Sequence, residues 1–104
     1  MSYFIHITAT AERDIMAAAD YIEFTLKNPT AANHLLDVAT ERINSLADMP
    51  QKHSLVDDPV LASWEIRFVI VNNYLAFYTI DKEMQRVILI RFLYQKSNWN
   101  NILR

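Results

Sequence analysis

The feature that most constrains this chain is the complete absence of glycine from its 104 residues. Glycine lets a backbone turn with positive φ or approach a phosphate closely. A Walker A loop, a dinucleotide-binding fingerprint and a glycine-rich kinase loop are therefore excluded, and with them the common nucleotide-dependent enzymes. Tight turns have to use another residue, and asparagine is the best substitute.

Composition predicts one soluble domain. The chain weighs 12.2 kDa and is 52% hydrophobic and 21% charged, which is enough to bury a core over residues 1–104. It has no cysteine, which excludes disulfide scaffolds, thiol nucleophiles and cysteine-bound metal centres. The N-terminus does not resemble a signal peptide, and the apolar stretch 66–80 is too short and too interrupted to cross a membrane. We expect a cytoplasmic protein that does not engage a membrane.

Apolar residues recur at helical spacing in two successive segments, 10–27 and 29–48. Thr10 is placed to cap the first of these helices. Asn28-Pro29 interrupts the pattern and also begins the second helix, because asparagine is a preferred N-cap and proline a preferred first helical residue. The two segments predict a helical hairpin.

Two aromatic residues of the first helix, Tyr21 and Phe24, lie off its main apolar stripe. They either complete a wider core face or mark a surface for a partner. We favour the core interpretation.

Strand patterns occupy residues 3–8, 64–71, 74–80 and 87–93, and a polar connection over 49–63 joins the second helical segment to the last three strands. The order is therefore β-α-α-β-β-β. Segregated helices and strands predict an α+β fold, with the helical hairpin packed on one face of a mostly antiparallel sheet. The apolar tail around Trp99 is expected to pack onto that body.

Asn72-Asn73 predicts a two-residue turn with positive φ at both positions. Counting outward from this turn, Arg67 lies opposite Tyr78 and Glu65 lies opposite Ile80, all on one face. The opposite, apolar face is expected to pack on the helices, and it carries Ile66, Phe68, Ile70, Leu75, Phe77, Ile88, Ile90 and Phe92.

The same alternation places Arg91 of the last strand on the Arg67 face. Two neighbouring guanidinium groups suit a phosphate or carboxylate, which would relieve their repulsion. The alternative is structural: Arg67 pairs with Glu65 or another acid, stacks on Tyr78 and does nothing else.

The chain resembles the RelE/ParE superfamily, the toxins of bacterial type II toxin–antitoxin modules and plasmid-stabilisation systems. The resemblance extends over nearly the whole sequence and includes the order of elements. The matching stretches are Ile5-His6-Ile7-Thr8 with Ala11 and Asp14-Ile15, Leu55-Val56, Ile66-Arg67, Asn73-Tyr74-Leu75-Ala76-Phe77-Tyr78, Val87-Ile88-Leu89-Ile90-Arg91-Phe92-Leu93-Tyr94, and Trp99.

The resemblance implies growth inhibition by one of two activities. ParE-like members poison DNA gyrase, RelE-like members cleave mRNA on the ribosome, and both are neutralised by a cognate antitoxin. The net charge of −2 and the long helical hairpin favour a ParE-like toxin acting on gyrase or another protein target. The alternatives are a RelE-like endoribonuclease and a degenerate, non-toxic interaction module. The oligomeric state stays open.

Site residues follow from the resemblance position by position. In a nuclease, the resemblance implies that Arg67 and Arg91 hold the scissile phosphate and that Tyr94 lies near the position where such members place a tyrosine or histidine as general acid. Glu65 is the candidate base because it is the only carboxylate on this face of the predicted sheet, and the resemblance does not supply it. In either activity an anion- or partner-binding set is expected, consisting of Arg67, Tyr78, Arg91 and Lys96. No cofactor and no metal are expected; His34 and Asp37 share a helix face but lack further ligands.

Charge divides unevenly along the chain. Residues 1–48 carry three basic and seven acidic side chains, whereas residues 49–104 carry seven basic and five acidic ones. The division indicates either a polarised surface or ordinary variation in composition.

Overall fold

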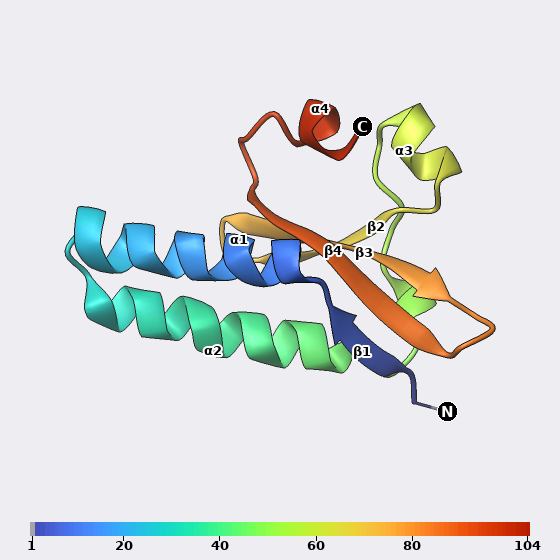
Figure 1. Ribbon diagram of the computed structural model, residues 1–104, viewed down its shortest axis with the longest axis horizontal. Coiled ribbons are helices and arrows are strands. Elements are labelled where there is room, and N and C mark those ends of the chain that lie inside the picture. Colours follow the sequence, from blue (N-terminus) through green and yellow to red (C-terminus); the bar gives the residue numbers. More distant parts are fainter. Residues whose placement is uncertain (1) are drawn as a thin grey trace.

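The computed structural model describes residues 2–104 and shows a twisted four-stranded sheet with two long helices side by side along one face (Figure 1). The strand order is β1-β4-β3-β2. β1 pairs parallel with β4, and the other two pairs are antiparallel. The predicted α+β, mostly antiparallel fold is therefore confirmed. The strands are β1 (Phe4–Ile7), β2 (Arg67–Val71), β3 (Tyr74–Asp81) and β4 (Arg86–Tyr94).

The helical hairpin consists of α1 (Ala9–Asp20), a π-helical turn η1 (Tyr21–Thr25) and α2 (Pro29–Ser45). Asn28 caps α2 by accepting a hydrogen bond from the Ala31 N–H, as predicted. The predicted cap of α1 at Thr10 is wrong, because Thr8 fills that role.

Thr8 ties the start of α1 to the sheet. Its hydroxyl accepts from the Ala11 N–H at 3.1 Å and donates to the Leu89 carbonyl of β4 at 2.9 Å. One side chain therefore both caps the helix and fixes where the helix leaves β1. The end of α2 is set in a comparable way, since the Tyr3 N–H donates to the Ala47 carbonyl just beyond the helix.

The helices cover the sheet face that carries Arg67, which is the opposite of the sequence prediction. On this face, small and aliphatic side chains of the strands pack against a stripe of α2. The alternation of β2, of β3 and of β4 up to Leu89 is as predicted, but the sheet is apolar on both faces, so alternation alone could not identify the covered one. The buried residues of this core include Val69, Val71, Ala76, Tyr78, Val87 and Leu89 from the strands, and Leu35, Ala39, Ile43 and Leu46 from α2 and its end.

The second face is covered by two short helices, α3 (Pro59–Ser63) and α4 (Trp99–Leu103). Figure 1 shows both on the side of the sheet away from the hairpin. Trp99 lies 5.3 Å from Phe77 between ring centroids, so the predicted packing of the tail is confirmed. The rest of this second core consists of Val56, Leu61, Ile66 and Leu75, with Phe68, Ile90, Leu93 and Leu103 at its edge. No helix over residues 2–104 has the length and apolarity needed to traverse a bilayer.

Among residues 2–104, five non-glycine residues take the left-handed conformation, which in other proteins is mostly adopted by glycine. Asn72 has φ 54°, and the β2–β3 register is the predicted one, with Val71 opposite Tyr74. Asn73 is not among the five, so the prediction of positive φ at both turn positions is wrong. The others are Lys27, Met49, Glu65 and Gln85.

Candidate partner-binding surface

Arg67 and Tyr78 are neighbours, as predicted, and both donate hydrogen bonds to main-chain carbonyls of residues 50–53. The Arg67 guanidinium donates to the carbonyls of His53 at 2.6 Å and Gln51 at 3.2 Å. The Tyr78 hydroxyl donates to the Pro50 carbonyl at 2.6 Å. Burial raises the pKa of Tyr78 to about 12, with Arg67 opposing that rise. Together the two side chains fasten residues 50–53 to the sheet.

Arg91 lies on the other face of the sheet. Tyr78 pairs with Leu89 and Phe77 pairs with Arg91, so Ile90 is an extra residue in β4. Such a bulge reverses the alternation beyond it. The predicted shared face for Arg67 and Arg91 is therefore wrong, and so is the placement of Phe92, which lies in the helix-side core.

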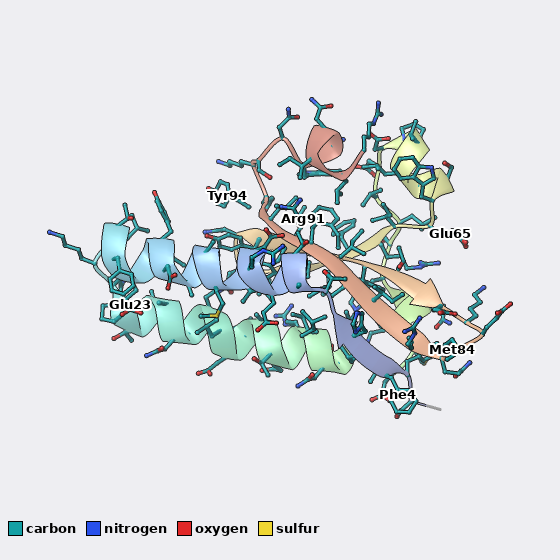
Figure 2. The ribbon with its side chains drawn as sticks, viewed as in Figure 1. Phe4, Glu23, Glu65, Met84, Arg91 and Tyr94 are labelled. Carbon is teal, nitrogen blue, oxygen red and sulfur yellow. The ribbon has the colours of Figure 1, made fainter. Side chains whose placement is uncertain are left out.

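The Arg91 guanidinium is already paired with a carboxylate. Its Nε donates to Asp14 Oδ2 at 2.7 Å and a terminal nitrogen donates to Oδ1 at 3.0 Å. The Phe92 N–H donates to the same carboxylate at 3.0 Å. The bond to Asp14 raises the pKa of Arg91. Figure 2 shows Arg91 beside α1, and this fork links the helix to β4 just beyond the residues that pair with β1.

Glu65 is not part of the sheet, so its predicted position opposite Ile80 is wrong. It follows α3 with φ 60°, and its N–H donates to the Ala62 carbonyl while the Ile66 N–H donates to Leu61. These two bonds define a Schellman helix end, with Glu65 in the position that usually holds glycine. Its carboxylate shares a shallow cavity with Arg67, but no ion pair joins the two among residues 2–104.

Tyr94 and Lys96 lie at the opposite end of the sheet from Glu65. Tyr94 ends β4 and its side chain is 45% exposed, and Lys96 is exposed in the following turn. Figure 2 shows Tyr94 and Glu65 on opposite sides of the molecule. The residues carried over from nuclease members therefore do not form one constellation around a common point.

A groove does open at the tip of the helical hairpin, where η1 and the start of α2 approach the β2–β3 turn. Its volume is about 780 Å³. Burial raises the pKa of Tyr74 in this groove, and the nearby Tyr94 and Tyr21 hydroxyls act in the same direction. Three tyrosines from three elements thus face one space. The remaining lining is mostly apolar or neutral and consists of Ile22, Leu26, Asn28, Ala31, His34, Leu35, Asn72 and Asn73.

Large apolar side chains continue from the groove onto the outer surface of η1. Tyr21 is 53% exposed and Phe24 is 68% exposed, and Leu26 is also exposed. The interpretation of Tyr21 and Phe24 as core residues is therefore wrong, and the alternative of a partner surface is the one the exposure supports. The feature of the sequence that pointed to this surface was the offset of Tyr21 and Phe24 from the apolar stripe. The π-helical turn that carries both residues could be recognised only in the structure.

The fold and this surface define a class: a small α+β protein whose two sheet arginines are hydrogen-bonded within the chain and whose helical hairpin carries an exposed aromatic groove. Within residues 2–104 no three metal-ligating side chains come close enough together to bind a metal ion.

Comparison with known proteins gives the family. A family model described as the ParE toxin of the type II toxin–antitoxin system parDE matches residues 5–99. The chain therefore belongs to the ParE toxin family. No curated protein sequence matches it.

Two solved structures share the fold. A chain of the chromosomal ParDE system from P. aeruginosa has a TM-score of 0.73 at 14% identity, covering 89% of this chain and 96% of its own. A chain of the RelBE2 toxin–antitoxin complex from Mycobacterium tuberculosis has a TM-score of 0.60 at 20% identity, covering 90% and 99%. Both neighbours come from toxin–antitoxin systems.

Proposed function

We propose that this toxin is ParE-like: it inhibits growth by binding DNA gyrase or another protein target in the cytoplasm, and a cognate antitoxin neutralises it. The observation that carries the proposal is the state of the two arginines. Transition-state stabilisation in a nuclease needs cationic groups free to face the phosphate. Here Arg67 is bound to main-chain carbonyls and Arg91 to the Asp14 carboxylate.

The antitoxin is proposed to cover the hairpin-tip groove. Exposed aromatic side chains around a concave apolar surface are the usual anchors of a protein interface. Tyr21, Phe24 and Tyr94 provide three such side chains within or beside the groove. Covering them would also remove exposed aromatic surface of the free toxin from water.

Induced expression of the chain in a bacterial host tests the proposal. We expect growth arrest with DNA-damage signalling, intact transcripts, and inhibition of purified gyrase in a supercoiling assay. Arrest with cut transcripts would replace the proposal with the RelE-like endoribonuclease. An absence of arrest from well-expressed, folded protein would support a degenerate module.

A second measurement tests the groove itself. Tyr21→Ser together with Phe24→Ser should weaken antitoxin binding at least tenfold, because two anchors are lost. Met84→Ser is the matched control, since Met84 is 62% exposed but lies on the β3–β4 turn, away from the hairpin tip. Equal binding by the double variant and the control would place the antitoxin elsewhere.

A further inference from the structure

β1 is the outermost strand on one side of the sheet, and half of its main-chain groups have no partner (Figure 1). The N–H groups of Phe4 and Thr8 donate to carbonyls at and just before β4. Parallel pairing engages alternate residues, so the main-chain groups of His6 also face β4, whereas those of Ile5 and Ile7 face outward. Among residues 2–104, no hydrogen bond satisfies these outward groups.

The chain itself flanks only the beginning of this edge. The Tyr3 N–H donates to the Ala47 carbonyl, and Ser2 bridges to Asp48. Edge strands are usually protected from added strands by lysine, proline or a bulge. Residues 3–8 contain no lysine or proline, and the register of β1 with β4 is regular. The rest of the edge therefore remains open to an added strand.

The side chains of the open edge are apolar or neutral, and they are exposed. Phe4 is 73% exposed and Ile7 is 40% exposed, and His6 is exposed between them. Figure 2 shows Phe4 at the margin of the molecule. The sequence contains no aspartate, glutamate, lysine or arginine before Glu12. Two copies of this strand therefore meet without like-charge repulsion, whereas a charged partner segment would find no opposite charge on the strand.

The positions of the unpaired groups select one register for two such strands. In an antiparallel pair centred on His6, Ile5 lies opposite Ile7 of the second copy, and each such pair exchanges two hydrogen bonds. A pair centred on Ile5 would place Ile7 opposite Tyr3, whose N–H is already bound. A pair centred on Ile7 would place Ile5 opposite Ala9, the first residue of α1. Only the register centred on His6 satisfies every outward group.

We propose that β1 is a self-association edge, at which a second copy of this chain pairs antiparallel through its own β1 about a two-fold axis at His6. The two His6 residues then form a non-hydrogen-bonded pair, with their Cα atoms about 4.5 Å apart. Ile5 packs in the helix-side core, so alternation places Phe4 and His6 on the other face. There each Phe4 lies diagonally across from His6 of the second copy. The inference is independent of the toxin's target and of the groove proposed for the antitoxin.

Sedimentation equilibrium of the full chain measures the association. An edge this short buries less than about 1,200 Å² in total, which is typical of weak, concentration-dependent dimers. We expect the apparent mass to rise from 12.2 kDa towards twice that value as the concentration is raised from about 10 µM to about 1 mM. A monomer over the whole range would overturn the inference.

Charge substitutions at the axis test the pairing. His6→Glu and His6→Lys should each weaken self-association at least tenfold, because two like charges then face each other across the axis. An equimolar mixture of the two variants should restore association, because opposite charges then meet. His34→Glu and His34→Lys are the matched controls on an exposed histidine of α2 and should associate as the wild type does. No weakening at His6, no recovery in the mixture, or an equal effect at His34 would contradict the proposal.

Crosslinking tests the register, since the chain has no cysteine of its own. With oxidised glutathione, His6→Cys should form a disulfide-linked dimer, because a Cα separation of about 4.5 Å lies within the range that a disulfide spans. Phe4→Cys should crosslink at least tenfold more slowly, because the two Phe4 positions lie about 14 Å apart along the strands in this register. Equal rates for the two variants would overturn the inference. Circular dichroism shows whether each variant is folded, and the cysteine pair decides if a charged variant is not.

Discussion

Removing the Asp14 carboxylate should destabilise the protein more than removing any other partly exposed side chain of α1. Asp14 accepts two hydrogen bonds from Arg91 and one from the Phe92 N–H, and the two side chains are only 16% and 29% exposed. In Asp14→Ala the guanidinium and the amide lose their acceptor together. A hydrogen bond to a charged group contributes about 1.5–3 kcal/mol, and an unpaired buried donor costs about 1–3 kcal/mol.

Because Arg91 is partly exposed, water can replace some of the hydrogen bonds that it loses. We therefore expect Asp14→Ala to lower the free energy of unfolding by about 2–3 kcal/mol. In a chain of this size that corresponds to a fall in Tm of roughly 10–15 °C. Urea denaturation followed by circular dichroism measures it. Asp37→Ala is the control, because Asp37 is an exposed carboxylate on α2.

A double-mutant cycle with Arg91→Ala tests the coupling directly. The combined variant should lose clearly less stability than the sum of the single variants, because one interaction is counted twice in that sum. A loss below about 0.5 kcal/mol for Asp14→Ala, or strict additivity in the cycle, would refute the claim that Arg91 is occupied structurally. With either result, Arg91 would again be a candidate for binding a phosphate.

Three further predictions concern strain and titration. Glu65→Gly should stabilise the fold by about 0.5–1 kcal/mol in urea denaturation, because glycine takes positive φ without strain, whereas Glu65→Ala should not; a less stable glycine variant would contradict this. The pKa of Tyr78 is raised to about 12, so its contribution to the free energy of unfolding is complete below the unfolded pKa near 10 and is lost as the pH rises towards 12. Tyr78→Phe should therefore flatten the fall in stability between about pH 10 and 12, and an unchanged dependence of stability on pH would refute this. Burial acts to raise the pKa of Asp58, but hydrogen bonds from two backbone amides, Arg104 and Asn100 lower it overall. The contribution of Asp58 to the free energy of unfolding is therefore present above about pH 4 and is lost on further acidification. Tryptophan fluorescence should report loosening of α4 in that acidic range and at higher pH in Arg104→Ala, and identical transitions would argue against this anchor.

Local rules in the sequence were sufficient at two places where residue type decides how the backbone turns or a helix begins. Asn28-Pro29 predicted both the end of one helix and the start of the next, and the cap is the predicted one. Asn72-Asn73 predicted a two-residue turn and the pairing of Arg67 with Tyr78. The α1 cap was missed because two threonines two residues apart satisfy the same local rule, and only contact with β4 selects Thr8.

The sequence by itself determined the order of the four strands and the two long helices, the α+β class, the strand offset at the asparagine turn and the apolar stripe of α2, since each follows from periodicity or from one residue's φ preference. The short helices α3 and α4 were not predicted. Only the tertiary structure decided which face of the sheet the helices cover, because both faces bury aliphatic side chains. It also decided where Arg91 points, since one extra residue at Ile90 moves every later side chain to the other face. The exposure of Tyr21 and Phe24 was decided in the same way, because whether an aromatic ring is buried depends on what lies across from it in space.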